Sequence, residues 1–329
     1  MTLKKGKENC ITDVQGVKVG HVTLYEKLDE ENTICTGVTA ILPHGGNLFK
    51  EKVHASSAVI NGFGKTAGLI QLDELGFLES PIMLTNTFSI GSVLQGTLQH
   101  MLDENKDIGD NTSTINIVVG ECNDGYLNSI RLQAVKPEHA VQAIKNAKPE
   151  PVEEGAVGAG KGMVCFGYKG GIGTSSRVVS EGGEAYTIGV LVLSNYGSRD
   201  EALFADFNKI ELNTPDGSIM MIVATDAPLY DRQLKRLANR CAAGLGRTGS
   251  HIAHGSGDIA IAFSTANTHR HYFDSPVESI TFVRDSHPIM NRLFQAVTEA
   301  TEEAVIRSLK MAETTEGRKG RVVEKAPLG

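Results

Sequence analysis

The sequence predicts a single-domain α/β protein in which paired β-sheets are flanked by helices. Short apolar strands come in runs with few helices between them, and this favours paired sheets over a regular βαβ repeat. Few segments show the apolar spacing of an amphipathic helix. The chain has 329 residues, 40% of them hydrophobic, which is ample for one large core. We find no internal repeat that would divide residues 1–329 into smaller units.

The first half of the chain alternates short strands with two helices. Strand-like pieces occupy 11–42, and apolar strands are predicted at 55–60, 82–85 and 114–120. Residues 91–105 carry apolar side chains at helical spacing, with Ser89 or Ser92 as a candidate cap. Pro137 opens a second helix, which stops near Pro149.

The second half is richer in strands and ends in a helix. After a loop at 149–160, strands are predicted at 162–168, 185–197 and 218–226. A long helix at 231–250, a strand at 258–267 and a helix from about 287 to 312 complete the chain. The stretch 200–217 is the most polar and irregular.

Composition excludes several classes of function. The net charge of −7 argues against a nucleic-acid partner. Five cysteines without a CxxC pair indicate neither a disulfide framework nor a zinc site, so buried free thiols in a reducing cytosol are expected. The start "MTLKKGKENC" has no apolar signal region, and no apolar run approaches the ~18 residues of a membrane span. A cytoplasmic protein with no membrane partner is the expectation.

Two patterns suggest cofactors but are incomplete. "GAVGAGKG" at 155–162 fits G-x4-G-K, yet Gly162 stands where a P-loop needs Ser or Thr, and no strand precedes it. These glycines are more typical of a turn where two backbones approach closely. Neither histidine pair, His251 and His254 or His269 and His271, has a carboxylate or cysteine that completes a metal site. No metal or organic cofactor is predicted.

Ser218 stands between a turn and an apolar strand, in "TPDGSIMMIVATDAPL". One interpretation is a plain turn, because Pro-Asp-Gly is turn chemistry and a turn must precede a strand. The other is that Ser218 is a nucleophile at the rigid start of a buried strand, where the chain is cut.

Other polar side chains flank predicted strands. Glu121 ends one strand and either caps a turn or faces a cleft. Asn195 ends another, as a turn residue or as a donor to an oxyanion. Ser256 and Asp258 are two apart at the start of a strand, so both side chains point to one face. They either relay and orient a proton or merely bind each other in a turn.

Several stretches in the same order resemble one family. They are "ITDVQGVKVGHVTL", "TGVTAILPHGG", "VINGFGKTAG", "GECNDGYLN", "GSIMMIVATDAPL" and "GSGDIAIAFSTAN", and they span residues 11–275. The resemblance is to the DmpA-like aminopeptidases, the P1 or S58 family, which includes L-aminopeptidase/D-esterases and β-peptidyl aminopeptidases. It implies a four-layer α/β/β/α sandwich, similar in layering to N-terminal nucleophile hydrolases.

The resemblance implies self-cleavage between Gly217 and Ser218, into an α chain of residues 1–217 and a β chain of 218–329. Ser218 would then be the nucleophile. Its new α-amine, with a reference pKa of about 7.7–8.0, or the pair Ser256 and Asp258 would accept its proton, and both alternatives stay open. We expect Ser218 within hydrogen-bond reach of Ser256. Gly217 suits the step because glycine tolerates strained backbone.

The remaining site residues also follow from the resemblance. Asn195 matches the asparagine of the oxyanion hole, and Glu121 matches the carboxylate that holds the substrate's free amine. The family often has Tyr two residues after this Glu, where this chain has Asn123; Tyr126, three residues further on, is the candidate replacement.

The function implied is a serine aminopeptidase acting through an acyl-enzyme on small peptides or amino-acid amides, with esters as a further substrate class. The enzyme would be a homo-oligomer, a tetramer of αβ units. One alternative is an acyltransferase of the ornithine acetyltransferase type, which uses Thr as nucleophile. Others are a hydrolase of β-peptides or ω-amino-acid amides, and a non-catalytic binding protein that keeps the fold.

Overall fold

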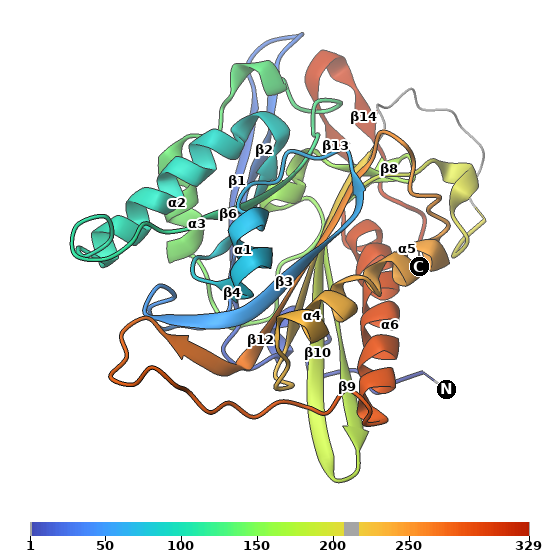
Figure 1. Ribbon diagram of the computed structural model, residues 1–329. Helices are drawn as coiled ribbons and strands as arrows, with labels where there is room; N and C mark the ends of the chain where they lie inside the picture. Colours follow the sequence, from blue (N-terminus) through green and yellow to red (C-terminus); the bar gives the residue numbers. More distant parts are fainter. Residues whose placement is uncertain (1, 207–216, 329) are drawn as a thin grey trace.

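The computed structural model describes residues 2–206 and 217–328. Two sheets stack face to face (Figure 1). The smaller has the order β1-β2-β5-β6, with bounds Lys18–Lys27, Thr33–Leu42, Ile82–Asn86 and Val118–Cys122. The larger has the order β4-β3-β12-β11-β10-β9, with bounds Phe77–Leu78, Glu51–Gly62, Gly257–Arg270, Ser218–Thr225, Glu184–Asn195 and Gly171–Glu181.

Helices cover the outer face of each sheet (Figure 1). The four-stranded sheet packs against α2 (Ile90–Glu104) and α3 (Pro137–Lys145). The six-stranded sheet packs against α4 (Asp231–Ala238), α5 (Cys241–Thr248) and α6 (Ile289–Lys310). The short elements are α1 (Leu69–Leu75), β7 (Val164–Cys165), β8 (Tyr168–Lys169), β13 (Thr315–Glu316) and β14 (Val322–Val323).

Three apolar layers separate these four layers of structure. One lies between α2, α3 and the four-stranded sheet, one between the two sheets, and one between the six-stranded sheet and α4, α5 and α6. This arrangement confirms the predicted α/β/β/α sandwich.

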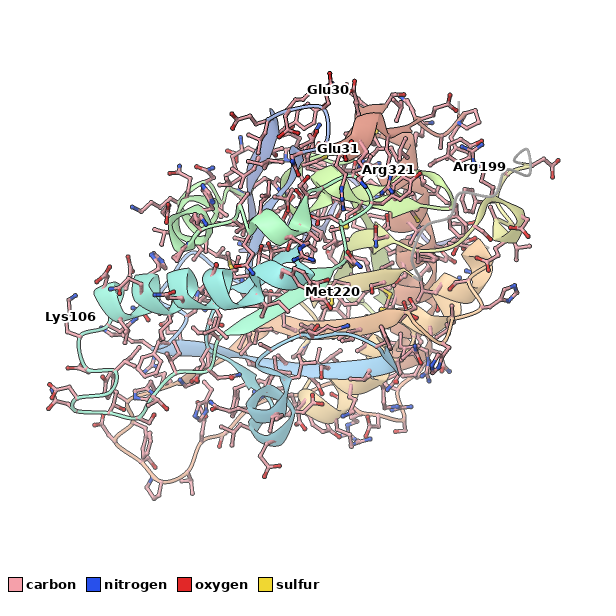
Figure 2. The ribbon with its side chains drawn as sticks, turned by 90° about the horizontal axis from the view of Figure 1, so that it is seen from above. Glu30, Glu31, Lys106, Arg199, Met220 and Arg321 are labelled. Atoms are coloured by element: carbon pink, nitrogen blue, oxygen red, sulfur yellow. The ribbon has the colours of Figure 1, made fainter. Side chains whose placement is uncertain are left out.

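Strand β11 lies at the centre of the larger sheet and is buried on both faces. It pairs antiparallel with β10 and parallel with β12. Ile219 and Met221 face the layer under the helices, whereas Met220 and Ile222 face the layer between the sheets. Figure 2 shows Met220 near the middle of the molecule. Burial on both faces explains why this strand is a continuous apolar run rather than an alternating one.

The structure differs from the predicted elements in a few places. Strand β9 was not predicted from the sequence, and the expected long helix at 231–250 is two helices, α4 and α5. The strand expected at 114–120 begins at Val118, and 162–168 holds only the two-residue β7 and the start of β8. Of the stretch predicted to be irregular, 200–217, residues 207–216 lie outside the described part of the chain.

The prediction that the cysteines are buried free thiols is confirmed. All five, Cys10, Cys35, Cys122, Cys165 and Cys241, are free and buried. None of the helices within the described ranges has the length and apolar character needed to cross a bilayer.

Candidate functional site

Ser218 is the first residue of β11 and lies between two other candidate site residues. In the sheet register it is opposite Asn195 of β10 on one side and Gly257 of β12 on the other. Its side chain is buried, and its Oγ accepts a hydrogen bond from the Gly257 backbone amide at 3.2 Å. Gly257 follows Ser256 directly, whereas a contact between Ser218 and Ser256 themselves stays a prediction.

Gly217 packs against β10 so closely that no side chain fits. A Cβ at this position would collide with the Asn195 carbonyl oxygen and the Tyr196 Cα. Its φ is not in the left-handed region. Close backbone approach therefore accounts for a glycine here, and its tolerance of the strained backbone needed for cleavage stays a prediction.

Ser256 and Asp258 are paired as their spacing predicts. Ser256 Oγ donates to Asp258 Oδ1 at 2.7 Å, and both side chains are buried. Burial raises the pKa of Asp258 to about 6, although the hydrogen bond from Ser256 favours the ionised form. Asp258 Oδ2 is buried and has no hydrogen-bond partner among the described residues. Asp258 Oδ2 can therefore accept a further hydrogen bond.

Asn61, which was not predicted as a site residue, holds the turn before Ser256. Its Nδ2 lies 3.0 Å from the Ala253 carbonyl oxygen, 3.1 Å from that of His254 and 2.5 Å from that of Ser256. Asn61 lies opposite Asp258 in the antiparallel pairing of β3 and β12. Only this long-range pairing brings it to the site, so no local sequence pattern reveals it.

Asn195 has an amide whose orientation is fixed by its partners. Its Oδ1 accepts from the Val164 amide at 2.9 Å, and its Nδ2 donates to the Asn123 carbonyl oxygen at 3.0 Å. A donor on one side and an acceptor on the other allow only one assignment of the oxygen and nitrogen. Nδ2 carries two hydrogens, so one remains available to a ligand.

Glu121 is held where the parallel strands β5 and β6 end together. Its Oε1 accepts from the Lys65 amide at 2.9 Å, and its Oε2 accepts from the Thr87 hydroxyl. Thr87 immediately follows β5, whose Thr85 is the register partner of Glu121. The carboxylate is buried, yet it can accept further hydrogen bonds because an ionised carboxylate has about four lone-pair sites.

The loop at 63–65 connects Glu121 with the partner strand of Ser218. A Cβ on Gly64 would lie 3.7 Å from both Glu121 Oε1 and the Gly257 Cα. A Cβ on Gly257 would in turn lie 2.8 Å from the Phe63 carbonyl oxygen. The Glu121 carboxylate and the start of β12 therefore both lie next to Gly64. Because Gly257 of β12 is the register partner of Ser218, Glu121 is at the same edge of the molecule as Ser218.

Asn123 and Tyr126 reach the site from the loop after β6. A small cavity lies beside Gly217, and it is lined by Asn123, Tyr126, Val164, Asn195, Tyr196, Gly197 and Gly217. Asn123 Oδ1 accepts from the Gly125 amide at 2.9 Å, and the Tyr126 ring stacks under the Arg321 guanidinium at 4.5 Å. The side chain of Asn123 thus supports the turn, while its carbonyl binds Asn195.

The glycine-rich stretch forms a tightly packed turn, as the close-approach interpretation predicts. Residues Gly158–Gly162 form a short 3₁₀ helix. A Cβ on Gly160 would lie 2.6 Å from the Ile172 amide nitrogen, and one on Gly162 would collide with the Cys35 carbonyl. Within the described ranges, no group of three His, Cys, Asp or Glu side chains is close enough to hold a metal ion.

The four-layer α/β/β/α sandwich, together with the match to a peptidase family and to β-peptidyl aminopeptidases, places the protein among the hydrolases. The chain matches peptidase family S58 over residues 9–323 and belongs to that family. Its activity class is that of a serine aminopeptidase, and the acyltransferase alternative is not favoured.

Relatives of known structure or activity span nearly the whole chain. The β-peptidyl aminopeptidase BapA of Sphingosinicella microcystinivorans is 40% identical, over 98% of this chain and 87% of the relative. The PH0078 protein from Pyrococcus horikoshii OT3 has 51% identity and a TM-score of 0.92, over 99% of this chain and 93% of that one. The L-aminopeptidase D-Ala-esterase/amidase from Ochrobactrum anthropi, described as a variant of the Ntn hydrolase fold, has 36% identity and a TM-score of 0.91, over 99% and 93%.

Proposed function

We propose that this aminopeptidase matures by cutting itself at Gly217–Ser218 and that Ser218 is the nucleophile of both the maturation and the peptidase reaction. The observation that carries the proposal is the placement of Ser218 at the start of β11, between Asn195 and Gly257. A nucleophile at the end of a doubly buried strand is held in one geometry. The single domain 1–329 would become an α chain, 1–217, and a β chain, 218–329.

In maturation, Ser218 Oγ adds to the Gly217 carbonyl carbon, and the bond from that carbon to the Ser218 nitrogen breaks. The resulting ester is hydrolysed by water, which leaves a carboxylate on Gly217 and a free amine on Ser218. The close packing of Gly217 on the Asn195 backbone supports this step, because it fixes the scissile carbonyl beside the site.

In peptidase turnover, the same Oγ attacks the acyl carbon of the substrate and forms an acyl-enzyme that water then hydrolyses. The uncommitted hydrogen of Asn195 Nδ2 would donate to the oxyanion. Glu121 would hold the substrate's free ammonium, and Asn123 and Tyr126 would contact the substrate from the neighbouring loop. The proton of Ser218 passes either to its own α-amine or to the pair Ser256 and Asp258.

The pH dependence of turnover distinguishes these two proton acceptors. Because burial raises the pKa of Asp258 to about 6, its ionised form is present above that pH and is lost as the pH falls through about 6. If the pair accepts the proton, kcat falls with an apparent pKa near 6, and Asp258→Asn removes that limb while lowering kcat at pH 8. An acid limb near pH 7.7–8.0 that Asp258→Asn leaves in place would assign the proton to the α-amine.

Glu121→Gln is expected to lower kcat/KM for amino-acyl amides ten- to a hundredfold in matured enzyme. Glutamine can keep both hydrogen bonds, accepting from Lys65 and donating to Thr87, so the change removes mainly the charge. A hydrogen bond between charged groups contributes about 1.5–3 kcal/mol, and each 1.36 kcal/mol is about tenfold in rate. The measurement is steady-state kinetics on one amide with a free and with an N-acetylated amine.

The acetylated substrate is the control for this experiment. It should be poor for the parent enzyme and should lose little more in the variant. Equal losses on both substrates would mean that Glu121 supports the fold instead of the amine, and the specificity for a free N-terminus would need another residue.

We infer small N-terminal residues as the substrate class, because relatives act on β-peptides or carry L-aminopeptidase and D-Ala-esterase/amidase activities by name. Esters and β- or ω-amino-acid amides belong to the same range. We also propose a cytoplasmic homo-oligomer of αβ units, a tetramer, that works without a metal or an organic cofactor.

A further inference from the structure

Lys169 is a fully buried lysine. Within the described residues, its ammonium group donates hydrogen bonds to backbone carbonyls only. Lys169 lies in β8, and none of its side chain is exposed. Its Nζ donates to the carbonyl oxygens of Gly160 at 2.9 Å, Met163 at 2.7 Å and Gly170 at 2.8 Å. An ammonium has three N–H donors, so all three are used. A neutral amine has two and would leave one of these carbonyls unpaired.

One of these carbonyls, that of Gly160, lies in the glycine-rich turn Gly158–Gly162, and Met163 caps the end of this turn. The turn is also held by hydrogen bonds from its Gly158 and Ala159 amides to the Thr23 and Thr39 hydroxyls. Apart from Lys161 the turn is made of small residues, and Gly160 packs against the Ile172 backbone without room for a Cβ. Groups outside the turn therefore supply most of the contacts that hold it. The ammonium of Lys169 donates to the carbonyl oxygens of Gly160, Met163 and Gly170 and so links the turn to the start of β9.

The residue that follows this turn binds the candidate oxyanion donor. Val164 is next to Met163, and its amide donates to Asn195 Oδ1 at 2.9 Å. That bond decides which end of the Asn195 side chain is oxygen and leaves Nδ2 facing Asn123 and the cavity. A displaced Val164 amide would release the amide of Asn195 to rotate.

We propose that Lys169 is a positioning residue for catalysis: it holds the turn that presents the Val164 amide to Asn195 and so aims Nδ2 at the developing oxyanion. This inference rests on the oxyanion role of Asn195 proposed above. Burial lowers the pKa of Lys169 to about 7, whereas the three carbonyl oxygens that accept from its ammonium favour the charged form. The rival account is that Lys169 only stabilises the fold.

A double-mutant cycle separates the two accounts. Lys169→Met, Asn195→Ala and the double variant are compared in matured enzyme, with kcat expressed per active site titrated by a serine-reactive sulfonyl fluoride. We expect Lys169→Met to lower kcat ten- to a hundredfold with KM changed less than about threefold. In the double variant kcat should be within about twofold of that of Asn195→Ala alone, because Lys169 acts only through Asn195.

Lys161→Met is the matched control. Lys161 lies in the same turn, but its Nζ is placed over the Tyr25 ring at 4.2 Å. Removing this charge should leave kcat within about twofold of the parent. A comparable loss in Lys161→Met would show that removing either cation lowers kcat, and this would overturn the specific role of Lys169.

Val164→Pro keeps the proposal testable if Lys169→Met does not fold. Proline removes the amide that binds Asn195, and Met163, with φ −82° and ψ 145°, already has the backbone conformation that a residue before proline prefers. We expect a ten- to hundredfold lower kcat that is not additive with Asn195→Ala. Unchanged kcat in Val164→Pro, or losses that add to those of Asn195→Ala, would overturn the inference. If Asn195→Ala itself leaves kcat unchanged, the proposed oxyanion role fails, and the inference fails with it.

Discussion

Replacing Ser218 with alanine is expected to leave one uncut chain of residues 1–329 and no measurable aminopeptidase activity. The wild-type protein should give two species by intact mass, residues 1–217 and 218–329. The Ser218 hydroxyl is the attacking group in both proposed reactions, and the structure gives it one hydrogen bond, from the Gly257 amide. Loss of that one bond should cost the fold only about 0.5–1.5 kcal/mol, so the variant should fold.

Conservative replacements are the control for this experiment. Ser218→Thr and Ser218→Cys keep a nucleophilic atom at the same position and should be cut slowly, with residual turnover. Cleavage of Ser218→Ala at the same bond would show that another protease makes the cut. A wild-type chain that is active and uncut would remove Ser218 as an N-terminal nucleophile.

Asn195→Ala is expected to lower kcat by about a hundred- to a thousandfold, the loss typical of removing one oxyanion-hole donor. The change deletes the Nδ2 hydrogen that remains after Nδ2 donates to Asn123. KM should change far less, because the oxyanion exists only in the transition state. Steady-state kinetics on titrated, matured enzyme measures both.

The alternative is that Asn195→Ala acts through the fold, because it also removes the acceptor for the Val164 amide. Thermal unfolding of the variant tests this. Asn239→Ala is a matched control, since Asn239 Nδ2 donates to the exposed Lys235 carbonyl at the end of α4 and to no residue of the site among its described hydrogen bonds. An activity loss that follows the folded fraction in both variants would contradict the oxyanion role.

The layered fold was predictable, yet strand β9 was not, and its packing explains why. The segment "GIGTSSRVVSE" is neither continuously apolar nor alternating. A Cβ on Gly173 would collide with the Ala304 carbonyl of α6, so close helix packing requires glycine there. Arg177 points into the same interface and binds Glu299 and Glu303 at 3.2 and 2.7 Å. A buried surface made of small and charged residues resembles a loop when only the sequence is read.

The candidate site was predicted unevenly for a similar reason. Residues within one motif, such as Ser256 and Asp258, were paired correctly because they are two positions apart at the start of a strand. Asn61 and Gly64 were missed because their partners lie in β12 and β6. Sequence periodicity reports a residue's own element, whereas these contacts depend on which strands become neighbours.

Strand order gives the proposed cut an unusual thermodynamic consequence. Strands β11 and β12 come from the β chain, and they are inserted between β3 and β10 of the α chain. Each fragment would thus hold only part of the six-stranded sheet, and the two would stay joined by the β3–β12 and β11–β10 pairings. Once a matured molecule unfolds, recovery becomes a bimolecular encounter whose rate depends on protein concentration. The lifetime of the working enzyme would then be set by how slowly it opens rather than by a reversible folding equilibrium.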